Sequence, residues 1–176
     1  SIKLLEQLLD FCTDPNEIYS LLGVEYLLID DYESANECYK QCVALDPYDH
    51  TALYNVVFCY DFMDQQEKAV EYLLGFIEKE PYSEIAWHQL GNIYKDLGKE
   101  QKALEAYEYA LISDEYFVGA YLEKAKLLEQ KQEYHQAIEN YKITLQLDDP
   151  TAFAYHRIGK CFEALGEHAK ASQWYK

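Results

Sequence analysis

The sequence predicts an all-α fold in which antiparallel helix pairs recur along the chain. The first observation is a repeat period of about 34 residues, visible at two sets of equivalent positions. It gives one column of mostly aromatic residues, Tyr19, Leu53, Trp87, Tyr121 and Tyr155, and one column of small residues, Ala35, Ala69, Ala103, Ala137 and Ala171. The second observation is that apolar residues recur at three and four residues within each period, which places them on one face of an α-helix. Two such helices fit into each period.

One period is clearest between Trp87 and Ala110. The first predicted helix presents a bulky residue, a small residue and an aromatic one, and the second presents alanine and tyrosine at the same kind of spacing. These residues are Trp87, Leu90, Gly91, Tyr94, Ala103, Tyr107 and Ala110. The pattern resembles the tetratricopeptide repeat. The resemblance covers essentially the whole chain, and it implies a right-handed α-solenoid that acts as a protein-interaction module.

The same period divides the chain into repeats. We expect a single array over residues 1–176, in which residues 1–15 form the second helix of a preceding partial repeat. Full repeats would occupy 16–49, 50–83, 84–117 and 118–151, and a truncated fifth would occupy 152–176. Gly98 and Gly166 fall in the turn between the two helices of a repeat, where a left-handed residue costs glycine least. Because the pattern starts and stops inside repeats, we expect a fragment of a longer array.

The composition is strongly acidic. Lysine and arginine number 15 against 32 aspartates and glutamates, a formal net charge of -17. This balance argues against a general nucleic-acid-binding surface. The longest apolar stretches are far too short to cross a bilayer, so we expect no membrane insertion. Five cysteines at irregular spacing do not indicate a disulfide framework. We therefore expect a cytoplasmic protein, although a removed leader sequence would be compatible with the numbering.

No pattern in the sequence indicates catalysis. It contains no phosphate-binding glycine loop, no serine nucleophile motif and no helix with a paired-histidine zinc motif. Cys38 and Cys42 would lie one helical turn apart, but no further histidine or cysteine pair stands nearby to complete a metal site. We interpret them as buried packing residues. The sequence therefore predicts a protein that is not an enzyme and has no metal and no cofactor.

The candidate site is the face of each first helix that the resemblance implies to be concave. In the third repeat we expect this face to carry Ile85, His88, Asn92 and Lys95, turned away from the core. The equivalent positions of the other repeats predict that this face is apolar in the early repeats and polar and positively charged in the later repeats. The candidate partner-binding residues are Tyr54, Phe58, Phe62, His88, Asn92, Lys95, Lys126, His156, Arg157 and Lys160. The expected partner is a protein or peptide with apolar anchors at one end and acidic or amide groups at the other.

Alternative interpretations concern the neighbouring residues and the role of the array. Val24, Leu27 and Leu28 either extend the apolar part or pack against a preceding repeat. The carboxylate clamp of chaperone-binding relatives is not predicted, since Glu123 stands where the clamp needs an asparagine. Two other functions stay open: a recognition arm of a larger enzyme or signalling protein, and self-association into a homodimer through exposed solenoid ends near Trp174 and Tyr175.

Overall fold

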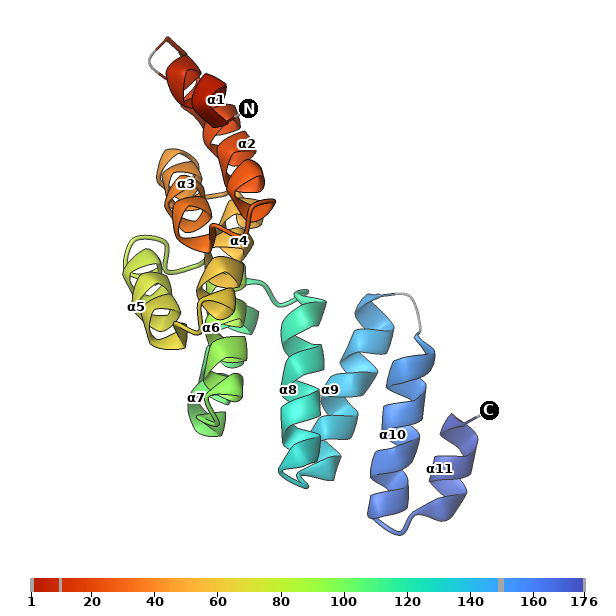
Figure 1. The fold of residues 1–176 in the computed structure, drawn as a ribbon. Helices are drawn as coiled ribbons and strands as arrows, with labels where there is room; N and C mark the ends of the chain where they lie inside the picture. The colour runs from red at the N-terminus through yellow and green to blue at the C-terminus, as the bar shows by residue number, and fades with distance from the viewer. Residues whose placement is uncertain (1, 10, 149–150, 176) are drawn as a thin grey trace. The chain divides into compact units, whose positions relative to one another are not determined.

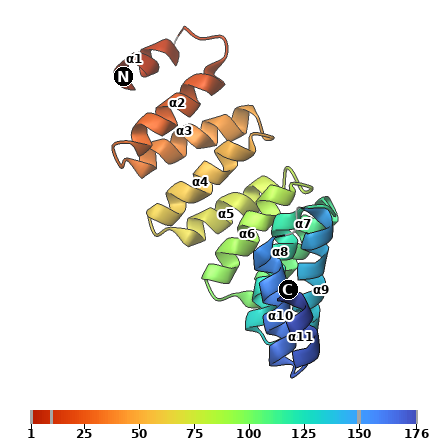
Figure 2. The ribbon, with the colours of Figure 1, turned by 90° about the vertical axis from the view of Figure 1, so that its right-hand side faces the viewer.

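The computed structural model describes residues 2–9, 11–148 and 151–175, and these residues form helices and connecting turns without a strand. The chain divides into two compact units, residues 1–81 and residues 82–176, which are described separately. Both are stacks of antiparallel helix pairs (Figures 1 and 2). The predicted all-α class and α-solenoid architecture are confirmed. The turn at Pro150 lies outside the described residues.

In its described residues, unit 1 contains five helices. They are α1 (Ile2–Leu9), α2 (Pro15–Leu27), α3 (Tyr32–Leu45), α4 (His50–Phe62) and α5 (Gln66–Ile77). Consecutive helices pack on one another in the zigzag visible in Figure 2. The helix starts follow from capping: the carboxylates of Asp14, Asp31 and Asp49 each accept a hydrogen bond from a backbone N–H in the first turn. The buried side chains of the core of this unit include Leu22, Tyr39, Leu53, Val56 and Leu73.

Unit 2 has six helices in the part that the structure describes. They are α6 (Glu84–Asp96), α7 (Glu100–Ser113), α8 (Val118–Gln130), α9 (Tyr134–Leu147), α10 (Ala152–Ala164) and α11 (His168–Trp174). Each helix packs against the next, and α6 also contacts α8. A continuous core runs through the unit, with Tyr107, Leu127, Tyr141 and Ile158 among its fully buried side chains.

Glycines on the first helices of two repeats permit close contact with the second helices of the same repeats. A Cβ atom at Gly23 would lie 2.6 Å from the Tyr39 ring, and one at Gly91 would lie 2.5 Å from the Tyr107 ring. Both distances are below van der Waals contact. The glycines therefore provide the space in which the tyrosine of the second helix is buried.

The turns within the repeats share one backbone conformation. Five residues, each one period from the next, have a positive φ: Asp30 (59°), Asp64 (56°), Gly98 (69°), Gln132 (63°) and Gly166 (75°). Asparagine, aspartate and glycine tolerate this region, whereas a longer side chain is strained there. The turn prediction from Gly98 and Gly166 is thus confirmed, and it extends to three residues that are not glycine.

Replacing Gln132 by glycine is expected to stabilise the protein by about 0.5–1 kcal/mol, because glycine relieves the strain of the positive φ. Urea unfolding followed by circular dichroism measures the effect. Gln130→Gly is the matched control, since Gln130 ends helix α8 and glycine there is expected to destabilise it by up to about 1 kcal/mol. Equal effects of the two substitutions would contradict the account.

Candidate partner-binding surface

Helix α4 carries an exposed aromatic strip, defined here as Tyr54, Phe58 and Phe62. The three residues are spaced by four, so they share one face of the helix. Their exposed fractions are 39%, 43% and 56%. The rings of Phe58 and Phe62 lie 4.5 Å apart, and Phe62 stacks on Tyr32 of α3 at 4.9 Å with an interplanar angle of 19°. The strip is therefore a partly ordered aromatic surface open to solvent.

Exposed aliphatic residues lie on α2 and at its C-cap, one period before the strip. Val24 and Leu28 occupy the positions of Phe58 and Phe62 in the preceding repeat, and they are 47% and 74% exposed. Helix α1 packs instead around Ile18 and Leu22. Packing of Val24 and Leu28 against a further repeat before α1 stays an alternative prediction. Unit 1 thus presents large apolar side chains along α2 and α4, the first helices of its two repeats.

His88, a candidate from unit 2, lies largely inside the protein. Neither ring nitrogen has a hydrogen-bond partner among the described residues, and both atoms are buried. The ring packs edge-on against Phe117 at 5.1 Å and lies 5.9 Å from the Tyr107 ring. Burial lowers the pKa of His88 to about 4. The residue is therefore a neutral packing group at physiological pH.

Phe117 explains why this histidine is covered. Asp49, Ser83, Phe117 and Thr151 occupy equivalent positions of successive repeats, at the starts of α4, α6, α8 and α10. The other three cap their helices through a side-chain oxygen, whereas Phe117 makes no side-chain capping bond and places its ring on His88. Ile85, also expected to face away from the core, is buried as well. The prediction of a fully open face on α6 is wrong for Ile85.

Asn92 and Lys95 lie farther along α6 and are engaged within unit 2. The Asn92 amide oxygen accepts a 2.8 Å hydrogen bond from the Tyr107 hydroxyl. Lys95 and Lys126 both bind Glu123, with Nζ–Oε distances of 2.7 and 2.6 Å. Burial alone would raise the pKa of Glu123, but the hydrogen bonds from the two lysines outweigh it and the pKa is lowered. This three-residue cluster keeps one net positive charge.

Arg157 is also paired within the unit. Its guanidinium makes a two-point contact with Glu129, with an Nη2–Oε1 distance of 2.5 Å and an Nε–Oε2 distance of 2.8 Å. The same carboxylate accepts a 2.9 Å hydrogen bond from the hydroxyl of Tyr141. The charge of Arg157 is thus neutralised internally. Only His156 and Lys160 among the later candidates are exposed, and Lys160 lies 3.6 Å from Glu163.

Lys126 lines a small cleft between α8 and α10. It has a volume of about 280 Å³ and is lined by Val118, Leu122, Lys126, Thr144, Asp148, Thr151 and Phe153. The Lys126 ammonium lies 5.6 Å from the centre of the Phe153 ring. Phe153 was not among the predicted site residues. The equivalent positions of the other repeats hold Glu17, Thr51, Ile85 and Gly119. An aromatic residue in this column is the signal that could have identified Phe153.

The cysteines serve mainly as packing residues. Cys38, Cys42, Cys59 and Cys161 are buried, and Cys12 is exposed. Burial raises the pKa of Cys38, Cys42 and Cys59 to about 11 and that of Cys161 to about 12. These four thiols are therefore protonated at neutral pH, so they are poor nucleophiles. Within the described parts of the chain, no three histidine, cysteine or carboxylate side chains are grouped as metal ligands would be.

The comparisons agree with the repeat pattern. Sequence profiles described as tetratricopeptide repeat match residues 17–49, 85–116 and 154–176, which together make half of the chain. This chain belongs to the tetratricopeptide repeat family. No curated protein sequence matches it. In the described residues, no helix is long and apolar enough to cross a membrane.

Several solved structures share the fold. A crystal structure of MamA protein has a TM-score of 0.73 at 24% identity and covers 91% of this chain and 87% of that one. A structure titled functional characterization of Pseudomonas aeruginosa pilF has a TM-score of 0.73 at 20% identity, with coverage of 97% and 78%. MamA from Desulfovibrio magneticus RS-1 has a TM-score of 0.70 at 16% identity, with 92% coverage of both chains. At these identities the likeness shows the fold alone.

Proposed function

We propose that this protein is a non-catalytic interaction scaffold and that the aromatic strip of α4 binds a partner protein. Family membership supports the scaffold function, because repeats of this class present surfaces to protein partners. The observation that carries the binding site is the exposure of Tyr54, Phe58 and Phe62 on one face of α4. Large aromatic side chains at a surface are the residues that contribute most to protein interfaces.

The partner chemistry follows from the surfaces of the two units taken separately. In unit 1 the strip, Val24 and Leu28 offer apolar contacts to a hydrophobic peptide or amphipathic helix. In unit 2 the cleft beside Lys126 offers an ammonium group and the Phe153 ring. The net positive charge of the Lys95–Glu123–Lys126 cluster favours an acidic group on the partner. His88, Asn92 and Arg157 support this surface from within, while His156 and Lys160 are exposed beside it.

The Phe58→Ala, Lys126→Glu double variant is expected to lose partner binding with nearly unchanged helicity and melting temperature. Phe58 is half exposed, so truncating it removes contact area without opening a core cavity. Lys126→Glu places a second carboxylate beside Glu123 and repels an acidic partner. Affinity capture from cell lysate, read by mass spectrometry, compares this variant with the wild type.

Leu74→Ala is the matched control for that capture experiment. Leu74 is an exposed apolar residue of α5, outside the aromatic strip, and its loss is expected to leave capture unchanged. The same proteins captured by the wild type and by the double variant would refute the assignment of the strip and the cleft. The single variants then assign the loss to unit 1 or to unit 2.

Self-association is a second candidate, favoured by one specific observation. Helices α10 and α11 border an open cavity of about 830 Å³, lined by Ala152, Phe153, Tyr155, His156, Trp174 and Tyr175. Tyr155 and Tyr175 are both exposed there. If this surface mediates a homodimer, Tyr155→Glu converts the dimer to a monomer in light-scattering measurements. A monomeric wild type would exclude this function.

A further inference from the structure

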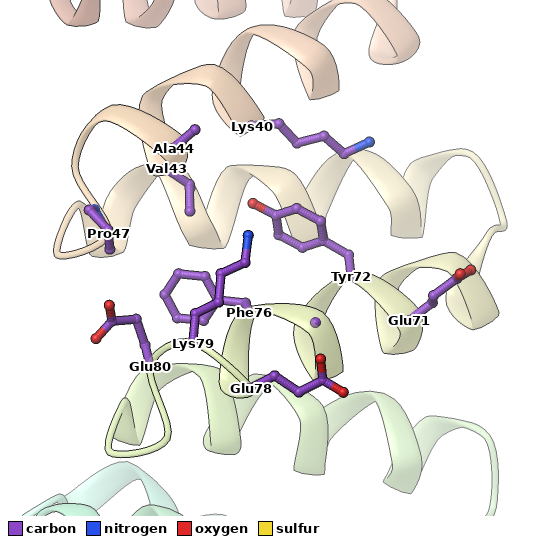
Figure 3. Close-up of a pocket in the computed structure, with 11 residues that line it drawn as sticks. Lys40, Val43, Ala44, Pro47, Glu71, Tyr72, Phe76, Glu78, Lys79 and Glu80 are labelled. Atoms are coloured by element: carbon purple, nitrogen blue, oxygen red, sulfur yellow. The ribbon is translucent and has the colours of Figure 1, made fainter.

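A pocket in unit 1 lies on the second helices of two repeats, between α3 and α5. Its volume is about 540 Å³, which is within the range of binding pockets for small ligands and inserted side chains. Figure 3 shows the residues that line it. Those that determine its chemistry are Lys40 and Val43 of the first repeat and Tyr72, Gly75, Phe76 and Lys79 of the second.

Gly75 lines the pocket and places no side chain in it. The same column holds Gln41, Tyr109 and Ile143 in the other repeats, and the Tyr109 ring stacks on Trp87 at 4.6 Å. A Cβ atom added at Gly75 would meet nothing within 4 Å. Glycine inside a helix costs about 1 kcal/mol relative to alanine. Helix α5 thus carries a residue of low helix propensity at a position that lines the pocket.

The walls of the pocket are apolar and aromatic. Val43 and Phe76 are buried, and the Tyr72 ring lies beside them in Figure 3. An aliphatic side chain of a partner would lie in the open space over Gly75 and contact these three side chains. The pocket therefore suits an apolar side chain.

Two ammonium groups border this apolar space. The Lys40 ammonium lies 5.0 Å from the Tyr60 ring centre and 5.8 Å from that of Tyr72, and Glu37 holds it at 2.8 Å. Lys79 extends into the pocket toward Val43 and Tyr72 in Figure 3. Among the described residues, Lys79 has no carboxylate within ion-pair distance, in contrast to Lys95 and Lys126.

The three glutamates that line the pocket do not point toward the ammonium groups of Lys40 and Lys79. In Figure 3, Glu71 and Glu80 lie at its two opposite ends, and the carboxylate of Glu78 points away from the two lysines. An unpaired ammonium beside an apolar space is complementary to a carboxylate attached to an apolar group.

We propose that the α3–α5 pocket is a second binding site, which takes a partner peptide segment with an aliphatic side chain next to an aspartate or glutamate. The aliphatic group fills the space over Gly75, and the acidic side chain pairs with Lys79 and Lys40. This site is independent of the aromatic strip. Tyr60 faces Lys40, whereas Phe58 is two residues away on α4 and points about 200° around the helix.

The test is a titration of ¹⁵N-labelled protein with two blocked tetrapeptides, Ac-Gly-Leu-Glu-Gly-NH₂ and its glutamine counterpart, observed by NMR. Because the chain has only seven glycines, the Gly75 amide is a convenient reporter. We expect a saturable shift of the Gly75 and Ala44 amides with the glutamate peptide. The glutamine peptide should bind about fivefold more weakly, as the loss of one exposed ion pair implies. Lys79→Gln should abolish this difference between the peptides.

Two variants of Gly75 separate pocket filling from unfolding. Gly75→Tyr copies the residue of the next repeat, and it should remove the Ala44 shift while the protein stays folded. Gly75→Ala is the control, since one methyl group in open space should preserve binding and raise the melting temperature. Equal affinity for the two peptides, shifts confined to α4, or no saturable shift would each overturn the proposal. Phe58→Ala should leave the titration unchanged, so failure here is distinguishable from failure of the aromatic strip.

Discussion

Gly91→Val is expected to destabilise the protein by about 3 kcal/mol, the upper part of the range for an overpacked core. A Cβ atom at this position would lie 2.5 Å from the Tyr107 ring. Tyr107 is fully buried, and its hydroxyl is held by Asn92, so the ring has little freedom to withdraw. Urea unfolding of the variant and the wild type measures the difference.

The neighbouring repeats provide the control for this prediction. The second repeat has Val57 where the third has Gly91, and Leu73 where the third has Tyr107. Valine should therefore be tolerated at position 91 once Tyr107 is replaced by leucine. In a double-mutant cycle, the cost of Gly91→Val should fall by at least about 1 kcal/mol in the Tyr107→Leu background. Additive effects of the two substitutions would show that the contact does not determine the cost.

Acid is expected to destabilise the protein through His88. Burial lowers the pKa of His88 to about 4, while an unfolded histidine titrates near 6.5. Between these values the unfolded chain binds the proton and the native chain does not. The contribution of neutral His88 to the free energy of unfolding is therefore fully present above about pH 6.5 and is lost as the pH falls toward 4. The loss is about 3 kcal/mol, at about 1.4 kcal/mol for each unit of the pKa difference.

His88→Leu isolates this contribution. Leu122 occupies the same column in the following repeat, and leucine has no ring nitrogens to bury. We expect the variant to be more stable than the wild type at pH 7 and to lose less stability between pH 6.5 and 4. Glu123 adds a separate acid dependence in both proteins, because its lowered pKa favours the native state only while it is ionised. Parallel pH profiles of the two proteins would contradict the assignment to His88.

Repetition made much of the fold predictable from the sequence. The columns through Gly91 and Tyr107 identified which faces pack, and the glycines at 98 and 166 identified the turns. These features are local or depend on one neighbouring helix, so the repeat period is sufficient to locate them. The exposure of Tyr54, Phe58 and Phe62 on α4 also follows from their spacing relative to the buried Leu53 and Val57.

The electrostatics of the candidate site could not be predicted in the same way. Lys95 pairs with Glu123, and Arg157 pairs with Glu129, across 28 residues in each case. Among so many carboxylates, the sequence does not indicate which one a lysine reaches. His88 was expected on a face turned away from the core, but Phe117 at the start of another helix covers its ring. The α3–α5 pocket was missed because its lining residues come from two helices of different repeats, and one of them, Gly75, has no side chain.

Site-specific photo-crosslinking tests the central claim most directly. p-Benzoylphenylalanine is introduced at position 58 on the aromatic strip and, in a separate protein, at position 74 on α5. Illumination in cell lysate is predicted to yield a discrete crosslinked partner from position 58 and none from position 74. Crosslinks of equal yield and identity from both positions, or from position 74 alone, would contradict the assignment of the α4 strip as the partner-binding surface.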